Sequence, residues 1–493
     1  MSQLTEQLKQ VLSTRQTDDS FDFAEAVSEV LSAANFKISD AGGNLSFSGR
    51  DPLLPTSLKL GNAAAVVLAA KAIAASLIWR NRGGDAQNIH IDVRKALKRF
   101  NGFFDGKYEQ VNGRPPSLKW NRTNPFFSLP MFRPTKDGRH VVALNIYPTL
   151  HTKALALLNC SDTTTAINEA ISKWNADDLE NAAAEAGVVI AKVRTTEEFL
   201  AESQYTDVLA NMPLISIEKI ADGEPVPFSP NPEQPLSGIR ALGYGHVIAG
   251  AGMGRDMASF GADVLNCWLA DDVEVEPFYW DAQVGMRSTY LGEKERPKFL
   301  DLLKDADVFF SNRHPGYIEQ QGLTAEALSK GHKGLIHAQV LLHGADGPWK
   351  YRPGFDEIGG CVSGCFTVDG SAGHPAELPS VPLVDNLVGW LGGIGIMSAL
   401  QRRAKEGGSY RVRVSLTRTC LWLQTLGLFD LEYAKKIASS SPEHTPQEPD
   451  LFTAETPLGH YQGLTDQIEF TSLKQAFKTV LEPMGANRPE WLS

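Results

Sequence analysis

Short apolar runs alternate with amphipathic stretches along the second half of the chain, with turn residues between them. Each short apolar run predicts a strand, and each stretch with apolar residues at helical spacing predicts a helix. Strands that alternate with helices favour a mostly parallel sheet covered on both faces, so this half predicts an α/β fold. The predicted strands are 239–243, 262–265, 307–310 and 334–338, and the predicted helices are 255–260, 297–305 and 324–329.

Three glycines lie between the first predicted strand and the first predicted helix. Gly250, Gly252 and Gly254 predict a flexible loop there. A glycine-rich turn after a strand also occurs in dinucleotide-binding proteins, but the spacing here does not match their fingerprint. A tight strand-to-helix turn is therefore favoured over a site for NAD, and a nicotinamide-dependent oxidoreductase stays an alternative.

Two polar stretches divide the chain. Residues 222–235 carry five prolines, which predicts an extended, irregular linker. Residues 439–449 are also polar and separate a C-terminal tail. The expected organisation is an N-terminal segment 1–59, a first half 60–221, the linker 222–235, a second half 236–433 and a tail 434–493.

An apolar run at residues 62–79 is long enough for a membrane helix, but its composition favours a buried one. The run is rich in alanine, contains Lys71 and is flanked by Lys59 and Arg80. Residues 1–10 are polar and lack the apolar core of a secretory signal. We therefore expect no membrane association and, with five cysteines that suggest reduced thiols, a cytoplasmic location.

The chain contains an internal repeat. Residues 76–93 can be laid on residues 399–416 at an offset of 323 positions (416 − 93), and both copies show an apolar helix, an arginine, a glycine turn and an alternating strand. Carried upstream without gaps, the same offset places Asn62 opposite Asp385. Chance similarity is the alternative, because a helix followed by a glycine and a strand is a common pattern.

Composition excludes some classes of function. A chain of 493 residues is long enough for about two to four domains. The net charge of −11 argues against a general binder of nucleic acids or anionic membranes. Cys361 and Cys365 have no histidine or cysteine partners near them in the sequence, so we expect no metal site.

Asp385 is the main candidate for chemistry. It stands in Val-Pro-Leu-Val-Asp-Asn-Leu-Val-Gly at 381–389, ahead of a long apolar run through Leu400. An aspartate at the start of a helix can simply cap the free N–H groups. A carboxylate can also act as a covalent nucleophile toward an acyl group. The residues alone leave both roles open.

The stretch from 235 to 428 resembles the family III CoA-transferases, also called the CaiB/BaiF family. The resemblance implies a Rossmann-like large domain with a mostly parallel sheet, a smaller α+β domain and an intertwined homodimer. It also implies that Asp385 is the catalytic nucleophile and that CoA or acyl-CoA is a substrate, with no permanently bound cofactor. The segments that carry it are Pro-Leu-Ser-Gly-Ile-Arg at 235–240, His-Val-Ile-Ala-Gly at 246–250, Asn-Arg-His-Pro-Gly at 312–316, Arg-Pro-Gly-Phe-Asp at 352–356 and the segment around Asp385.

The same resemblance implies a CoA-binding surface. Val247 and Ala249 lie where the family's loop backs the CoA, and backbone N–H groups and an arginine at the carboxyl end of a strand can hold phosphates. For Arg313 a solvated surface role is the alternative, and for Asp356 a structural cap. One family-typical basic residue is missing, because Cys-Trp-Leu stands at 267–269. The implied CoA-binding residues are Val247, Ala249, Arg296, Asn312, Arg313, Gly316, Phe355 and Asp356.

The order of segments departs from the family. Residues 124–138 resemble its small-domain entry, which usually follows the nucleophile segment but precedes it here. This order resembles a longer branch of the family, in which residues 60–221 form a small-domain-like half with a non-catalytic copy of the repeat. An amide is a far weaker nucleophile than a carboxylate, so Asn62 marks that copy as silent.

The resemblance implies a CoA-transferase that moves CoA from an acyl-CoA donor to a small carboxylic acid through a covalent aspartyl intermediate. Racemases of the family carry a histidine where this chain has Phe355, which cannot move a proton. A 2-methylacyl-CoA racemase or isomerase is therefore only an alternative. A catalytically silent CoA-binding or assembly protein is the other alternative, because the segments are rearranged.

Overall fold

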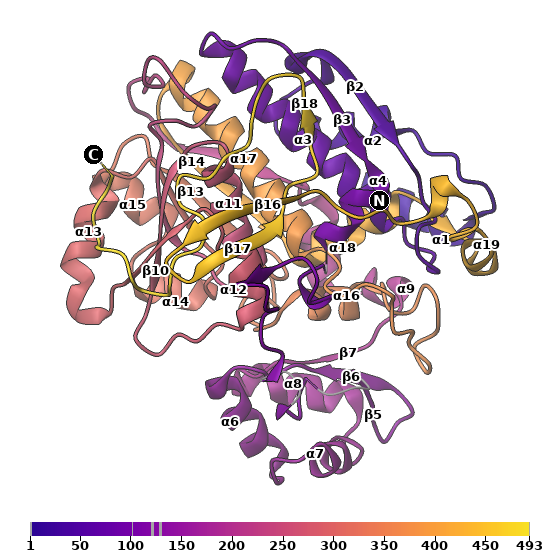
Figure 1. Ribbon diagram of the computed structural model, residues 1–493. Helices are drawn as coiled ribbons and strands as arrows, with labels where there is room; N and C mark the ends of the chain where they lie inside the picture. Colours follow the sequence, from indigo (N-terminus) through magenta and orange to yellow (C-terminus); the bar gives the residue numbers. More distant parts are fainter. Residues whose placement is uncertain (1, 101, 120–122, 128–130, 493) are drawn as a thin grey trace.

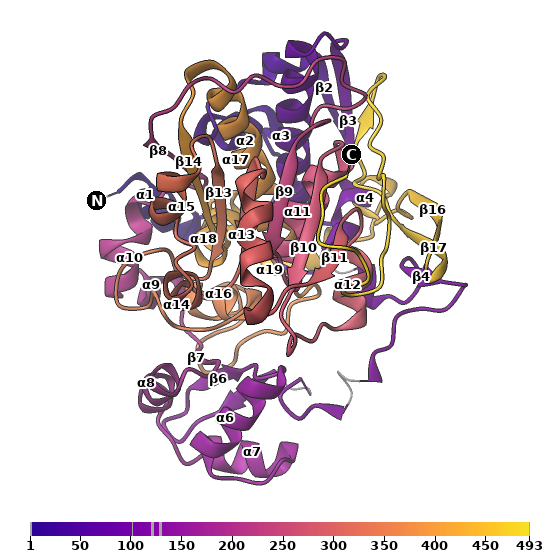
Figure 2. The same ribbon diagram turned by 90° about the vertical axis from the view of Figure 1, so that its left-hand side faces the viewer.

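The computed structural model describes residues 2–100, 102–119, 123–127 and 131–492. Its centre is a seven-stranded sheet with the strand order β11-β10-β9-β12-β13-β14-β8 (Figures 1 and 2). All neighbouring strands are parallel except the edge strand β8, which is antiparallel to β14. The strands are β8 (Ser216–Ala221), β9 (Arg240–Tyr244), β10 (Asp263–Trp268), β11 (Arg287–Tyr290), β12 (Val308–Ser311), β13 (Ile336–Leu341) and β14 (Ser409–Ser415).

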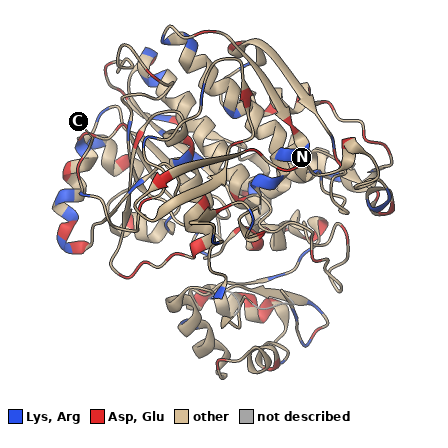
Figure 3. Ribbon diagram, in the orientation of Figure 1, with Lys and Arg blue, Asp and Glu red and all other residues tan. Residues whose placement is uncertain are grey.

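Helices cover both faces of this sheet because its strands are apolar on both sides. Leu242 and Tyr244 pack with Phe299 on one face, whereas Ala241 belongs to the large core on the other. The second face is covered by α11 (Ala249–Ser259) and α17 (Asp385–Glu406), and the first by α13 (Arg296–Lys304) and α14 (Pro315–Gln320), with α15 (Ala325–Gly331) near its β8 edge. Figure 3 shows basic and acidic residues interspersed on α13, which is an outer helix.

The predicted glycine loop is wrong, because Gly250, Gly252 and Gly254 lie inside α11. These glycines serve close packing. A Cβ built on Gly389 of α17 would lie 3.2 Å from the Cα atom of Gly252. A Cβ on Gly250 would lie 2.3 Å from the side chain of Asn312, so larger residues there would push α11 away from its neighbours.

The two copies of the repeat fold alike. Helix α3 (Leu60–Asn81) and helix α17 both have 22 residues, and they pack against each other. Each is followed by a strand and then by a helix with a polar N-cap: β3 (Gln87–Asp92) leads to α4 (Val93–Ala96), and β14 leads to α18 (Leu416–Thr425). Helix α3 is long and apolar enough to cross a membrane, but 94% of that stretch is buried inside the protein. A core helix meets the same criteria, and α3 is placed as one.

A smaller body lies below the large one (Figure 1). Its antiparallel sheet has the order β5-β6-β7, and its helices pack on that sheet around a separate apolar core. The predicted α/β fold with a smaller α+β unit is therefore confirmed, whereas the intertwining of two chains stays a prediction. Of the small-domain-like segment 124–138, residues 128–130 lie outside the described ones. The elements are β5 (Phe132–Pro134), β6 (His140–Ala143), β7 (Ile190–Lys192), α6 (Pro148–Leu158), α7 (Thr164–Ile171) and α8 (Ala176–Ala186).

The C-terminal tail pairs with strands from the first hundred or so residues. Strand β17 (Gly459–Leu464) joins β16 (Leu451–Thr456) to β4 (Gln110–Val111), and β18 (Glu469–Phe470) pairs with β3, next to β2 (Gly42–Ser48). Strand β1 (Arg15–Gln16) pairs with β15 (Leu428–Phe429). The predicted division of the chain into five segments stays a prediction. The remaining helices are α1 (Gln3–Ser13), α2 (Phe23–Ala33), α9 (Thr196–Phe199), α10 (Ser203–Asp207), α12 (Glu276–Ala282), α16 (Asp356–Ser363) and α19 (Leu431–Ile437).

A buried ionic network ties these distant segments together. The Nζ atom of Lys71 on α3 lies 2.8 Å from carboxylate oxygens of both Asp256 on α11 and Asp466 in the tail. The side chain of Lys71 has no exposed surface, and those of the two aspartates have almost none. An ion that far from water is stable only with its partners in place, so the network fixes how the three segments fit together.

Candidate active site

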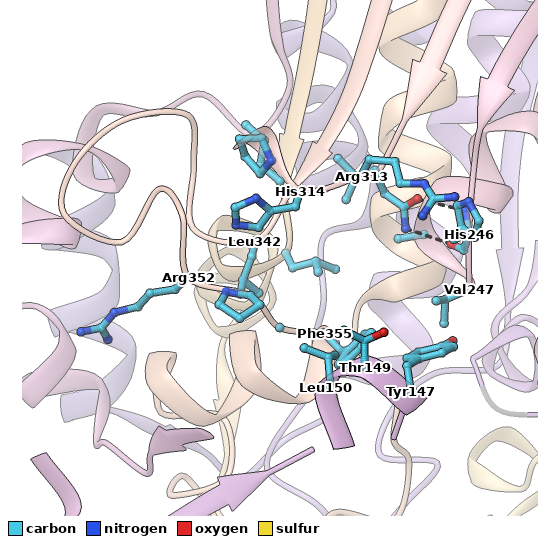
Figure 4. A pocket seen from close by; sticks show the side chains of 18 of the residues that line it. Tyr147, Thr149, Leu150, His246, Val247, Arg313, His314, Leu342, Arg352 and Phe355 are labelled. Carbon is cyan, nitrogen blue, oxygen red and sulfur yellow. Dashed lines mark hydrogen bonds between the residues drawn. The ribbon is translucent and has the colours of Figure 1, made fainter. Parts of the chain in front are cut away.

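A cavity of about 420 Å³ opens at the carboxyl ends of β9, β12 and β13. Ligands of doubly wound sheets usually bind at this edge. In Figure 4 Tyr147, Thr149 and Leu150 of the smaller body face Val247 and His246 of the large one across this space. We call it the strand-end cavity, and its lining includes Tyr147, Thr149, Leu150, His246, Val247, Ala249, Asp272, Asn312, Arg313, His314, Leu342, Lys350, Arg352, Phe355 and Asp385.

A second cavity, of about 700 Å³, adjoins the first. Its walls come from the segments around residues 104–146 and from the segment that precedes α17. Three residues line both cavities, namely Val247, Phe355 and Asp385. We call the second one the apolar cavity, and its other lining residues are Phe104, Leu118, Phe126, Phe127, Met131, Leu144, Ile146, Ile248, Phe278, Glu357, Glu377, Leu378, Pro379, Val381 and Pro382.

Asp385 is the first residue of α17, and its side chain does not cap that helix. The residue is only 8% exposed, and it stands in the wall where the two cavities meet. Burial raises the pKa of Asp385 well above its usual range, and the nearby carboxyl groups of Asp356 and Glu357 raise it further. Its carboxylate, when formed, is therefore poorly solvated and basic.

Asp356 supplies the cap that Asp385 does not. Its carboxylate accepts hydrogen bonds from the backbone N–H groups of Leu383, Val384 and Asp385, at 2.8, 2.5 and 2.9 Å. The residue is completely buried and lines neither cavity. This geometry is that of the structural cap that was its alternative role, and it lends the predicted contact of Asp356 with CoA no support.

Glu357 is a site residue that the sequence reasoning missed. It follows Asp356 directly and lines the apolar cavity. Burial raises its pKa to about 8, and the charge of Asp356 adds to the shift. At neutral pH the group is therefore largely uncharged, and a protonated carboxyl group can donate a hydrogen bond. The only local signal was its place next to the segment that carries the family resemblance.

The loop between β9 and α11 is held in an unusual conformation. Val247 has φ = 55°, which is rare for a β-branched residue. Its N–H donates to Glu274 at 2.7 Å, and the hydroxyl of Tyr147 donates to the same carboxyl group at 3.0 Å. Burial raises the pKa of Glu274 to about 7. Glu274 thus connects the loop of the large body to the smaller body across the strand-end cavity, and neither it nor Tyr147 was a sequence candidate.

Asn312 and Arg313 end β12 at the cavity. The side chain of Asn312 accepts from the N–H of His246 and donates to its carbonyl, both at 2.9 Å, and so fixes the loop that carries Val247. The guanidinium of Arg313 forms an ion pair with Asp272 and lies 5.8 Å from the ring centres of Tyr244 and Tyr317. Asn312 therefore acts on the loop, whereas Arg313 brings a positive charge into the wall.

Two predicted CoA-binding residues lie off both walls. Arg296 donates hydrogen bonds to the side chain and to the backbone carbonyl of Gln321. The N–H of Gly316 donates to Nδ1 of His314 at 3.1 Å. Neither residue lines a cavity, so the geometry lends the predicted contacts of Arg296 and Gly316 with CoA no support. Val247, Ala249, Asn312, Arg313 and Phe355 do line the strand-end cavity.

Two more cations reach the strand-end cavity, each beside an acid. Lys350 pairs with Glu319 at 2.8 Å, and Arg352 pairs with Glu180 of the smaller body at 3.1 Å. In Figure 4 the guanidinium of Arg352 points away from the other labelled side chains. The pKa of His246 lies well below its usual range because of burial and the nearby Arg313, so its ring is neutral. Among the described residues, no cluster of acidic, histidine and cysteine side chains could hold a metal ion.

Sequence comparison finds a known family over part of the chain. Residues 291–456 match the model of CoA-transferase family III. An acetyl-coenzyme A transferase, nodX, of Hypoxylon pulicicidum is 29% identical over 329 residues, which are 60% of this chain and 54% of that protein. The alpha subunit of succinyl-CoA–L-malate CoA-transferase from Chloroflexus aurantiacus is 29% identical over 213 residues, which are 40% of this chain and 50% of that protein. The family model and these relatives agree with the resemblance to CoA-transferase family III over part of the chain.

The matched region spans about half the length of these curated relatives. Among solved structures, a CaiB/BaiF family protein from Brucella suis is 22% identical with a TM-score of 0.36, and the match covers 46% of this chain and 65% of that one.

Proposed function

We propose that this protein transfers CoA between an acyl-CoA and a carboxylic acid through a covalent intermediate on Asp385. The proposal rests on the position of Asp385, which lines both cavities. The strand-end cavity suits the CoA part of the substrate, and the apolar cavity suits the acyl part. The thioester carbon joins these two parts, so a nucleophile at the junction faces the atom that it must attack.

The proposed reaction begins when the Asp385 carboxylate attacks the thioester carbonyl, which forms an aspartyl–acyl anhydride and expels CoA thiolate. The thiolate then attacks the aspartyl carbonyl of this anhydride, which releases the donor acid and leaves an aspartyl-CoA thioester. The acceptor carboxylate attacks this thioester and again expels CoA thiolate. The thiolate finally attacks the acceptor's acyl carbon, which yields the new acyl-CoA and restores Asp385. Each step exchanges one acyl bond, so the difficult overall exchange is divided.

The surroundings of Asp385 support this role. A carboxylate with few polar partners is a stronger nucleophile than one in water, because less solvent must be removed. The raised pKa of Asp385 reflects the same weak solvation. Loss of its proton to solvent or to a neighbouring carboxyl group would precede attack.

The CoA phosphates would be held by cations at the strand-end cavity. Arg313 and Lys350 line it, and each now has a carboxylate partner that a phosphate could replace. CoA acts here as a substrate, and the other partner is a small carboxylic acid. The homodimer and the cytoplasmic location stay predictions.

Hydroxylamine trapping tests the proposal. The full-length protein is incubated with acyl-CoA and hydroxylamine, which converts an aspartyl anhydride or thioester into a hydroxamate. We expect a hydroxamate on Asp385, close to one per chain, by peptide mass spectrometry. Asp385→Asn should give none, and Asn62→Asp should leave the yield unchanged because Asn62 is buried at the start of α3 and lines neither cavity.

Other outcomes would favour the alternatives. Thermal stabilisation by CoA without any hydroxamate would favour a silent CoA-binding protein. Exchange of the hydrogen at carbon 2 of a 2-methylacyl-CoA in deuterated water would favour a racemase. We expect no such exchange, because the neighbouring Phe355 has no group that can accept or donate a proton. Its ring packs against Tyr147 at a tilt of 32°, with ring centres 5.7 Å apart.

A further inference from the structure

The two cavities that share Asp385 differ in chemistry. Arg313, Lys350 and Arg352 reach the strand-end cavity, whereas the described lining of the apolar cavity contains no lysine, arginine or histidine. Its only ionisable groups are three acids: Asp385, Glu357 and Glu377. The part of the lining that the structure describes therefore offers no positive charge to a second anionic group on a bound acid.

The remaining lining is apolar, and part of it is aromatic. Five phenylalanines contribute to it, and Phe104 and Phe278 meet edge to face at 5.9 Å. A volume of about 700 Å³ lies within the range of pockets that enclose a drug-sized ligand. An acetyl group would leave most of this space unfilled.

The geometry points to a specific substrate class: the apolar cavity takes a bulky, apolar acyl group that carries no second carboxylate. This inference rests on the proposed function, since the acyl group is the one that Asp385 accepts. The chemistry selects straight, branched or aromatic monocarboxylic acids over dicarboxylic acids of the same length.

Two physical effects produce this selection. Apolar surface buried against the phenylalanines leaves water, so each added methylene should raise kcat/KM roughly fourfold until the cavity is full. A second carboxylate would lose its hydration without gaining a partner. It would also join the acidic cluster of Asp385, Asp356 and Glu357, which already disfavours further negative charge.

Glu377 and Glu357 hold different places in this cavity. Glu377 is exposed and Glu357 is partly buried next to Asp356, where burial keeps it largely protonated at neutral pH. A protonated Glu357 can donate a hydrogen bond without adding charge. It therefore tolerates an apolar acyl group beside it and gives a distal carboxylate no counter-charge.

A matched pair of substrates tests the inference. Hexanoyl-CoA and adipoyl-CoA have the same chain length and differ only in the distal carboxylate. We expect hexanoyl-CoA to form the Asp385 adduct with a kcat/KM at least about 100-fold higher. Butanoyl-CoA should be slower than hexanoyl-CoA. Equal or better use of adipoyl-CoA would overturn the inference while leaving the proposed transfer in place.

A substitution at Met131 provides a gain-of-function test. Met131 lines the apolar cavity and is partly exposed, so a longer side chain can be placed there without filling the core. Met131→Arg supplies the missing cation and should improve adipoyl-CoA relative to hexanoyl-CoA by about tenfold. Met131→Gln is the matched neutral control and should not. Equal changes in both variants would contradict the role of charge.

Direct binding separates this inference from the proposed function. Hexanoate and 4-phenylbutyrate should raise the melting temperature of the full-length protein in a saturable way, and adipate should not. Met131→Arg should reverse that order. Saturable binding of the apolar acids without any adduct on Asp385 would support the cavity and refute the transfer. Binding of adipate as tightly as hexanoate would refute the assigned class of acid.

Discussion

The carboxylate of Asp356 accepts a hydrogen bond from the backbone N–H of Asp385, with a nitrogen–oxygen distance of 2.9 Å. In the first copy of the repeat, Asp51 accepts in the same way from the N–H of Asn62 at 2.8 Å. A preceding acid therefore caps a long helix in both copies. Both copies of the repeat share this arrangement. At the position whose N–H is capped, the first copy has the amide Asn62, whereas the second copy has the carboxylic acid Asp385.

Because Asp356 caps α17 and Asp385 does not, replacing these two acids should affect the free energy of unfolding differently. Asp356→Ala should lower the free energy of unfolding by about 2–4 kcal/mol, because three buried N–H groups lose their acceptor. Asp385→Ala should leave stability unchanged or slightly raised, since it removes a buried acid that caps nothing. Urea unfolding at pH 7 measures both. Similar losses in the two variants would show that Asp385 is needed for the fold.

Glu357 should set the pH dependence of the reaction. Its charge is one of the causes that raise the pKa of Asp385. Glu357→Gln removes that cause, so the pKa of Asp385 falls and its carboxylate form persists to lower pH. The rate of hydroxamate formation should therefore reach its half-maximal value at a lower pH than in the unmodified protein. Met131→Gln, at another position of the same cavity, serves as the control and should leave the midpoint in place. A midpoint that moves upward in Glu357→Gln would contradict this electrostatic account.

Arg313 and Arg296 should differ in their effect on CoA binding. Arg313 lines the strand-end cavity, so Arg313→Ala should reduce the thermal shift produced by CoA, with an affinity loss of roughly tenfold. Arg296 is engaged with Gln321 away from the cavity, so Arg296→Ala should leave the shift close to normal. Thermal denaturation with CoA, and with NAD as the non-binding control, distinguishes them. A larger loss in Arg296→Ala would restore the contact first implied by the family resemblance.

Glu274 should make stability depend on pH. Its pKa in the folded protein is about 7, above the usual value near 4.5, so the folded state holds its proton more tightly than the unfolded chain. The resulting stabilisation is fully present below about pH 4.5 and is lost as pH rises through 7. Glu274→Gln should therefore flatten the fall in unfolding free energy between pH 4.5 and 7 by about 2 kcal/mol. Urea unfolding across this range is the measurement, and an unchanged slope would show that Glu274 does not titrate there.

The order of strands and helices in the second half could be predicted because apolar periodicity is local. The four predicted strands match β9, β10, β12 and β13, and two predicted helices match α13 and α15 to within a few residues. The predicted helix 255–260 covers only the second half of α11. The prediction of a glycine loop is wrong because Gly252 and Gly389 allow close packing between α11 and α17. This contact joins segments far apart in the sequence, so local sequence cannot reveal it. The sequence shows the position of a glycine, but only the folded structure shows which segment packs against it.

The candidate site was predictable only where one segment carries it. Asp385 and the end of β12 stand in recognisable segments, whereas Glu274 and Tyr147 meet through a single hydrogen bond between the two bodies. The apolar cavity likewise combines residues from around Phe104 to Ile146 with others from Val247 to Asp385. Such a wall depends on how the smaller body packs, for which spacing along the chain carries no signal.

The last prediction concerns the two halves of the chain. Strand β8 completes the central sheet against β14, α3 packs against α17, and Lys71 neutralises the buried Asp256 and Asp466. Fragment 233–493 would retain both aspartates without their lysine and would expose the apolar face of α17. Neither 1–232 nor 233–493 should therefore unfold cooperatively when expressed alone.

Co-expression of the two fragments should restore a soluble complex that forms the Asp385 hydroxamate. In the intact chain, Lys71→Met should cost about 3–5 kcal/mol of unfolding free energy, because it removes the closest cation from the buried carboxylates of Asp256 and Asp466. Lys95→Met is the control, since its ion pair with Asp450 is partly exposed and should be worth less than about 1 kcal/mol. Two separately folded fragments, with 233–493 fully active alone, would mean that α3 and its lysine are dispensable and that the halves are independent units. A loss in Lys71→Met no larger than in Lys95→Met would point the same way, because a network that holds the halves together cannot be removed at no cost.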